Sequence, residues 1–164
     1  MYRSATLSDN HRYRYELFRV WDTTLPTVIW LMLNPSTADT QTDDPTTRRV
    51  VSFSQSWGFG GLVVVNLFAM RAIRPSLLRN AVDPVGPDND ATLRRWVRRG
   101  GHLVAGWGVV PRCLRGRVTP AAKRMTDDLL CLGRTKEGRP RHPLYVRRDV
   151  RPVRLASTNW EQLL

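Results

Sequence analysis

The sequence has few residues of the kinds that build disulfide scaffolds or metal sites. It contains two cysteines, Cys113 and Cys131, in 164 residues. Two are too few for a disulfide framework or an all-cysteine zinc or iron–sulfur site. The three histidines have neither the spacing nor the cysteine neighbours of a metal site; they are His11, His102 and His142. We therefore expect two buried or incidental thiols, no metal and no cofactor.

Long apolar runs are also missing. The longest, Val28–Leu33 and Leu62–Val65, are far shorter than the roughly 20 residues that span a bilayer. The first residues, 2–14, are polar and charged and lack the apolar core of a secretory signal. A chain of 164 residues suits one hydrophobic core. We expect a cytoplasmic monomer with one domain over residues 1–164 and no contact with a membrane.

Acidic residues are scarce relative to basic ones. The chain has 26 Lys and Arg against 14 Asp and Glu, a net charge of +12. Residues 1–111 carry 13 basic and 9 acidic groups, whereas residues 112–164 carry 13 and 5. This surplus favours a polyanionic partner, and the last third of the chain is expected to face it. The alternative is codon bias, because all the basic residues except Lys123 and Lys136 are arginine.

Apolar periodicity predicts an α/β fold. Short runs rich in aliphatic and β-branched residues are typical of buried strands, and amphipathic stretches between them are typical of helices. Alternation of the two indicates a three-layer α/β/α domain with a mainly parallel four-stranded sheet. The expected core strands are 28–33, 62–65, 102–105 and 129–132, preceded by a strand at 13–21, and the expected helices are 44–57, 88–99 and 119–128.

Ligands of parallel α/β sheets bind outside the carboxyl ends of the strands. The residues that follow each expected core strand are therefore the candidates for function. Four segments meet this criterion: 34–39, 66–71, 106–108 and 133–145.

Two asparagines follow buried strands. Asn34 begins a polar, proline-containing segment, and its side chain is equally compatible with a strand-ending turn that satisfies its own backbone. Asn66 ends an aliphatic run, where an unpaired amide costs about 1–3 kcal/mol. An amide offers a donor and an acceptor to a nucleobase edge. Hydrogen bonds from a neighbouring loop are the alternative explanation for Asn66.

The segment 142–145, His-Pro-Leu-Tyr, lies among six cations. Such a loop is often merely solvated, but this bracketing suggests phosphate contacts around a base-directed tip. Trp107, between two glycines, is compatible with a pocket wall or with the core. The six cations are Arg134, Lys136, Arg139, Arg141, Arg147 and Arg148.

These segments resemble a bacterial and phage family known as domain of unknown function number 1643, over most of the chain. The order of the segments also resembles the uracil-DNA glycosylase superfamily. That group has a proline-containing water-positioning loop, a base-reading asparagine, a tryptophan-glycine pair and a histidine-proline loop after successive strands. The matching stretches are LNPSTAD (33–39), DDPTTRR (43–49), WGFGGLVVVNLFAMRA (57–72), DPVGPDND (83–90) and GRPRHPLY (138–145).

The second resemblance implies roles for individual residues. Asn34 would position water, Asn66 would read an extruded pyrimidine, and His142 would donate to the base oxygen as charge develops. The remaining assignments follow the same pattern: Pro35, Ser36 and Phe68 against the base, Leu144 as wedge, and Lys136, Arg139 and Arg141 on the DNA backbone.

Departures from the superfamily pattern matter for mechanism. The loop after the first core strand lacks the aspartate of the classical uracil enzymes, and Asp39 is the candidate substitute. The resemblance implies a cofactor-free DNA glycosylase that hydrolyses the N-glycosidic bond of a modified or damaged pyrimidine, with 5-hydroxymethyluracil among the candidates. A binding module for nucleic acid or nucleotide on the same fold is the alternative.

Overall fold

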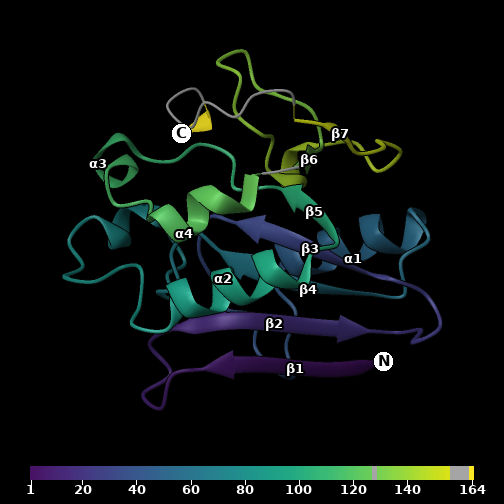
Figure 1. Ribbon diagram of the computed structural model, residues 1–164, viewed down its shortest axis with the longest axis horizontal. Helices are drawn as coiled ribbons and strands as arrows, with labels where there is room; N and C mark the ends of the chain where they lie inside the picture. Colours follow the sequence, from purple (N-terminus) through teal and green to yellow (C-terminus); the bar gives the residue numbers. More distant parts are fainter. Residues whose placement is uncertain (127–128, 156–162) are drawn as a thin grey trace.

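A seven-stranded mixed sheet organises the chain (Figure 1). The computed structural model describes residues 1–126, 129–155 and 163–164. Within these residues the strand order is β1-β2-β4-β3-β5-β6-β7, with three parallel and three antiparallel pairings. The strands are β1 (Tyr2–Leu7), β2 (Arg14–Val20), β3 (Thr27–Met32), β4 (Gly61–Asn66), β5 (His102–Ala105), β6 (Leu130–Cys131) and β7 (Val153–Arg154).

The four expected core strands are present and adjacent. They are β4, β3, β5 and β6, and every pairing among them is parallel. The strand expected at 13–21 is present as β2. The expected four-stranded extent of the sheet was wrong, because β1 and β2 extend one edge and β7 the other, all antiparallel. The residues of β1 and β7 are mostly exposed. Edge strands of this kind carry little apolar periodicity, so the sequence pattern did not reveal them.

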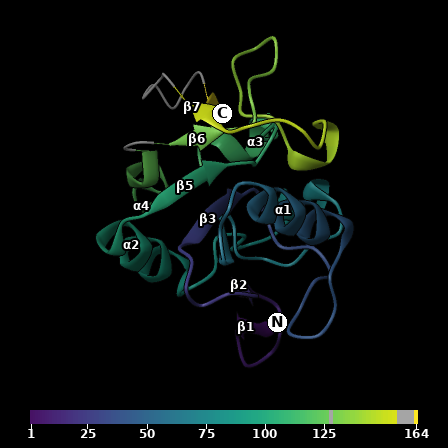
Figure 2. The same ribbon diagram turned by 90° about the vertical axis from the view of Figure 1, so that its right-hand side faces the viewer.

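Helices cover both faces of the sheet. Figure 2 shows α1 (Pro45–Ser56) on one side and α2 (Asn89–Arg99) and α4 (Pro120–Lys123) on the other. Helix α1 begins as expected, since the Asp44 carboxylate accepts a hydrogen bond from the Thr47 N–H at 2.7 Å. The expected helix at 119–128 is shorter, with a 3-10 turn at Arg124–Thr126, and positions 127 and 128 lie outside the described residues.

Two apolar clusters correspond to these two faces. One contains Val50 and Phe53 of α1 against Trp30, and the other contains Leu93 and Trp96 of α2. A four-residue α3 (Arg112–Arg115) precedes α4, and 3-10 turns occur at Pro75–Leu78 and Pro143–Tyr145. No helix among the described residues has both the length and the apolar character needed to cross a membrane.

A β-bulge at Tyr15 changes which face the start of β2 presents. Thr6 pairs with Glu16, but the next residue of β1, Leu7, pairs with Arg14, so Tyr15 is the extra residue. Leu17 packs in the α1-side cluster, whereas Tyr15 packs separately with Tyr13. Regular alternation would have kept Tyr15 and Leu17 on one face. A bulge re-aims the side chains beyond it, and Arg14 therefore turns toward the α1 side.

Candidate functional site

A cleft of about 770 Å³ opens at the carboxyl ends of β3, β4 and β5. Its volume falls in the usual range for small-molecule sites. All four segments expected from the sequence contribute side chains, joined by the first turn of α1 and by the buried start of β2. The lining includes Arg14, Asn34, Ser36, Thr37, Asp44, Asn66, Trp107, Gly108, Thr135, Arg141, His142, Leu144 and Tyr145.

Asn66 lines this cleft with an unpaired amide. Its side chain is 0% exposed, and neither Nδ2 nor Oδ1 has a hydrogen-bond partner among the described residues. Its backbone carbonyl, in contrast, accepts a hydrogen bond from Asn89 Nδ2 at 3.1 Å. The structure thus offers no loop partner of the kind that a purely structural Asn66 requires. A buried amide left unpaired costs free energy, so the unmet donor and acceptor indicate a ligand.

His142 presents a neutral imidazole to the same cleft. Its Nδ1 accepts a hydrogen bond from the Leu144 N–H at 3.3 Å, as the N-cap of the turn Pro143–Tyr145. This bond places the ring proton on Nε2. Burial lowers the pKa of His142 below 6.5, against a weaker opposing effect of the Asp44 charge. His142 is therefore a neutral N–H donor at neutral pH.

Arg49 of α1 holds the His142 loop in place. Its Nε donates to the Pro143 carbonyl at 3.3 Å, and its Nη2 donates to the Val146 carbonyl. The guanidinium also lies 5.0 Å from the centroid of the Phe53 ring. Arg49 thereby fixes the backbone on both sides of the 3-10 turn, and so the position of His142.

Glycines around Trp107 permit the close approach of the same loop. A Cβ on Gly106 would lie 3.3 Å from Pro143 Cδ, and a Cβ on Gly108, which has a φ of +70°, would lie 3.2 Å from His142 Cβ. Trp107 is buried in the core, donates from Nε1 to the Leu163 carbonyl at 3.2 Å and also lines the cleft. Both roles considered for Trp107 from the sequence are thus present together.

The loop after β3 combines a turn with cleft lining. Asn34 Nδ2 donates to the carbonyls of Pro35 and Ala72 at 2.9 and 2.8 Å, so the turn explanation accounts for this amide group. Asn34 Oδ1 accepts no hydrogen bond within the described part of the chain and is free to hold a water. Ser36 lines the cleft, whereas Pro35 is buried and is not among the lining residues.

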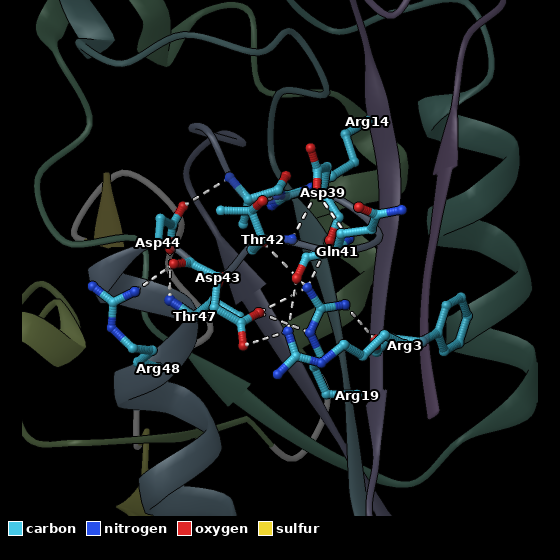
Figure 3. Close-up of polar contacts among 12 residues, drawn as sticks. Arg3, Arg14, Arg19, Asp39, Gln41, Thr42, Asp43, Asp44, Thr47 and Arg48 are labelled. Atoms are coloured by element: carbon cyan, nitrogen blue, oxygen red, sulfur yellow. Dashed lines mark hydrogen bonds and ion pairs between the residues drawn. The ribbon is translucent and has the colours of Figure 1, made fainter. Parts of the chain in front are cut away.

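Asp39 does not reach the cleft. Its Oδ1 accepts hydrogen bonds from the Gln41 and Thr42 N–H groups at 2.9 and 2.8 Å, which lower the pKa of the carboxyl. Its backbone carbonyl accepts from Arg19, which also pairs with Asp43 at 2.7 Å (Figure 3). The structure therefore gives Asp39 a role in closing its own loop, and places it outside the lining expected of a general base.

The carboxylate that does line the cleft is Asp44, the N-cap of α1, which was not among the expected site residues. Its Oδ1 and Oδ2 accept hydrogen bonds from Thr47 and Ala38 N–H groups at 2.7 and 3.4 Å. A helix that follows a parallel strand begins at the carboxyl edge of the sheet, and that relation could have identified Asp44. No group of three or more His, Cys, Asp or Glu in the described ranges is arranged to hold a metal ion.

Phe68 is placed in the core and not against a ligand. Its side chain is 0% exposed, packs in the α2-side cluster and is not among the residues that line the cleft. In a continuous strand, residues 66 and 68 would lie on the same face, but β4 ends at Asn66 and this alternation stops there. Tyr145, 82% exposed at the cleft and 5.7 Å from the His142 ring, is the aromatic side chain available for stacking.

The cations expected on the DNA backbone separate into two groups. Arg141 and the partly exposed Leu144 line the mouth of the cleft. Arg139 instead donates from Nε to the Leu164 carbonyl at 3.2 Å, and Lys136 is exposed and lies outside the lining. Of these three cations, Arg141 is thus the one that lines the cleft.

Comparison with known proteins identifies the family. A search of curated proteins and a search of solved structures found no match. The family model described as protein of unknown function (DUF1643) matches residues 14–144, which include every cleft residue named above except Tyr145. The chain therefore belongs to the DUF1643 family.

Proposed function

We propose that this protein is a cytoplasmic, monomeric DNA glycosylase that accepts an extruded, modified or damaged pyrimidine in the cleft and hydrolyses its N-glycosidic bond. The observation that carries the proposal is the unpaired Asn66 amide on the buried wall of the cleft. A side-chain amide pairs with a base edge that offers one acceptor and one donor. The O4 and N3–H of a uracil-type base offer that pair side by side.

His142 supplies the second element of the proposal. When the bond between C1′ and N1 breaks, its electron pair passes to the base, which leaves as an anion. The neutral Nε2–H of His142 can donate to a base oxygen as this negative charge develops. Burial favours the neutral imidazole, which donates through Nε2–H while Nδ1 accepts from the Leu144 N–H.

The sugar becomes cationic in the same step, and the cleft contains groups suited to it. The Asp44 carboxylate can stabilise the oxocarbenium-like charge, and Asn34 Oδ1 can hold the water whose oxygen forms the new bond to C1′. The proton that this water loses passes through solvent to the base anion, which leaves as the neutral base. Both Asp44 oxygens accept backbone hydrogen bonds, so we assign it electrostatic stabilisation in preference to proton abstraction.

The mouth of the cleft suits a DNA strand. Arg141 can contact a phosphate, Tyr145 can stack on a base and Leu144 can fill the gap left by the extruded nucleotide. The segment order that resembles the uracil-DNA glycosylase superfamily supports this arrangement, as does the net charge of +12.

The test is a panel of oligonucleotides containing uracil, 5-hydroxymethyluracil or mismatched thymine, followed by alkaline cleavage at abasic sites. We expect cleavage with at least one base, abolished in Asn66→Ala and retained in Arg98→Gln, an exposed change on α2. If the protein binds these oligonucleotides through Asn66 but leaves every base intact, the glycosylase proposal fails.

A non-catalytic binding module is the second candidate. The observation that favours it is the position of Asp39 outside the cleft. Asp44 is then the carboxylate that remains to activate a water, and the oxygens of Asp44 already accept backbone hydrogen bonds. Base-dependent binding without alkali-labile products would support this candidate.

A further inference from the structure

Arg14 is a buried cation without a direct counter-ion. Its residue is 3% exposed and lines the cleft. Its Nη1 donates to the Ala38 carbonyl at 2.5 Å, but its Nε has no hydrogen-bond partner among the described residues. None of the ion pairs within 4.0 Å in this part of the chain involves Arg14. Charged side chains are seldom buried without a pairing group.

The fold directs this guanidinium to the carboxyl end of β4. The bulge at Tyr15 turns Arg14 toward the α1 side of the sheet. Strand β4 lies between β2, which carries Arg14, and β3, whose following loop carries Ala38. An Arg14 side chain bonded to Ala38 therefore crosses the end of β4, and both Arg14 and Asn66 line the cleft.

The Arg14 charge persists at neutral pH. Burial lowers the pKa of Arg14 to about 10, and the Asp44 charge opposes this decrease. Arg71 and Arg19 add to the decrease. The cleft wall thus combines the Arg14 cation, which has no directly paired carboxylate, with the unpaired Asn66 amide.

We propose that the ligand of this cleft carries an oxyanion, a carboxylate or a phosphate, that enters together with the base and binds Arg14. This inference rests on the proposed function, because it assumes that Asn66 reads a pyrimidine. A planar guanidinium matches such an oxyanion geometrically and forms charge-assisted hydrogen bonds with it. The anion is either an acidic substituent of the base or the phosphate of the same nucleotide.

Contacts with the phosphates of a passing DNA strand do not explain why Arg14 is buried in the cleft. Phosphates of a strand that passes the cleft meet exposed cations such as Arg141. Arg14 is almost fully buried, so only a group inside the cleft can reach it. Arg14 therefore selects among ligands, whereas the rim cations increase affinity for any strand.

Calorimetric titration of the full chain with three small ligands tests the inference. The three ligands are the nucleosides deoxyuridine and 5-carboxydeoxyuridine and the nucleotide deoxyuridine 5′-monophosphate. We expect one of the acidic compounds to bind at least about tenfold tighter than deoxyuridine, as a charge-assisted hydrogen bond would provide. A gain with the carboxy compound assigns the anion to the base, and a gain with the monophosphate assigns it to the nucleotide phosphate. Equal affinity for all three overturns the inference.

Variants identify the residue responsible for any gain in affinity of the acidic compounds over deoxyuridine. The gain is measured in each variant as the ratio of its affinities for the acidic compound and for deoxyuridine. Arg14→Gln should abolish this gain, whereas Arg14→Lys should retain part of it by keeping the charge. If Arg14→Gln does not fold, the lysine variant decides, and a gain that is undiminished in it overturns the inference. A gain lost in Arg141→Gln and kept in Arg14→Gln also overturns it, because the anion then binds at the rim.

Asn66→Ala separates this inference from the proposed function. If deoxyuridine binds through Asn66 but the acidic compounds show no gain, the oxyanion inference fails and the base-reading proposal stands. If an acidic compound binds through Arg14 with equal affinity in Asn66→Ala, the oxyanion inference stands and the base-reading proposal fails.

Discussion

The Cα of Gly108 faces His142 so closely that a Cβ at this position would lie 3.2 Å from His142 Cβ. The residue also has a φ of +70°, in the left-handed region that L side chains rarely adopt. Two independent requirements for glycine therefore coincide beside the candidate donor. The loop after β5 and the loop after β6 are positioned relative to each other by this contact.

Gly108→Ala should displace His142 and strain the backbone. We expect a loss of about 1–2 kcal/mol in the free energy of unfolding from the left-handed conformation alone, and a lower single-turnover rate from the displaced imidazole. Gly116→Ala, with nothing within 4 Å of the added Cβ, is the matched control. Equal melting curves and equal rates for the two variants would contradict the assigned contact.

Asn66→Leu should separate stability from function. Removing an amide with two unpaired buried atoms should raise the free energy of unfolding by about 1–3 kcal/mol. Base binding should be lost, because leucine offers no donor or acceptor. Asn89→Leu is the control, since Asn89 Nδ2 donates to the Asn66 and Leu67 carbonyls and its removal should destabilise the protein. Denaturant unfolding with parallel binding assays measures both effects, and a destabilised Asn66→Leu would make Asn66 structural.

His142 should give a distinctive dependence on pH. Its folded pKa lies below 6.5, so the unfolded chain takes up a proton first as the pH falls. The stability contributed by the neutral ring is therefore fully present above pH 6.5 and decreases as the pH falls from 6.5 toward the folded pKa. The single-turnover rate should follow the same acid limb, since a proton on Nδ1 opposes the Leu144 N–H.

His142→Ala tests this assignment directly. The rate should fall by about 10²-fold, with affinity for undamaged DNA nearly unchanged. The pH dependence of unfolding in the acid range should also weaken. A variant that binds DNA more weakly but reacts at a normal rate at saturation would indicate a phosphate contact instead.

Arg139 and Arg141 form a matched pair for the electrostatic part of the proposal. Arg141→Gln should reduce the slope of log affinity against log salt by about 1, as expected for one phosphate contact. Arg139→Gln should leave the slope unchanged and lower the melting temperature, because it removes the bond to the Leu164 carbonyl. Salt titrations of duplex binding distinguish the two, and identical slopes for Arg141→Gln and the parent would exclude Arg141 as a contact.

Local sequence patterns were sufficient for much of the scaffold. The aliphatic runs at 28–33 and 62–65 predicted buried strands because few other structures satisfy so many consecutive apolar residues, and both are core strands. Asp44 followed by Pro45 predicted the start of α1, since capping depends only on neighbouring residues. The same reasoning placed Asn66 at a strand end, which is where the cleft lies.

Tertiary structure alone decided which of the polar residues enter that cleft. Asp39 and Asp44 belong to one polar segment, but Arg19 of β2 donates to the Asp39 carbonyl and pairs with Asp43, which fixes the segment with Asp39 outside the cleft. Phe68 turned into the core because β4 ends two residues before it. Arg14 lies in the cleft because the bulge at Tyr15 moves its side chain to the other face of the sheet, and that bulge arises in the pairing of β2 with β1. Such outcomes depend on contacts between distant segments, and periodicity along one segment does not encode them.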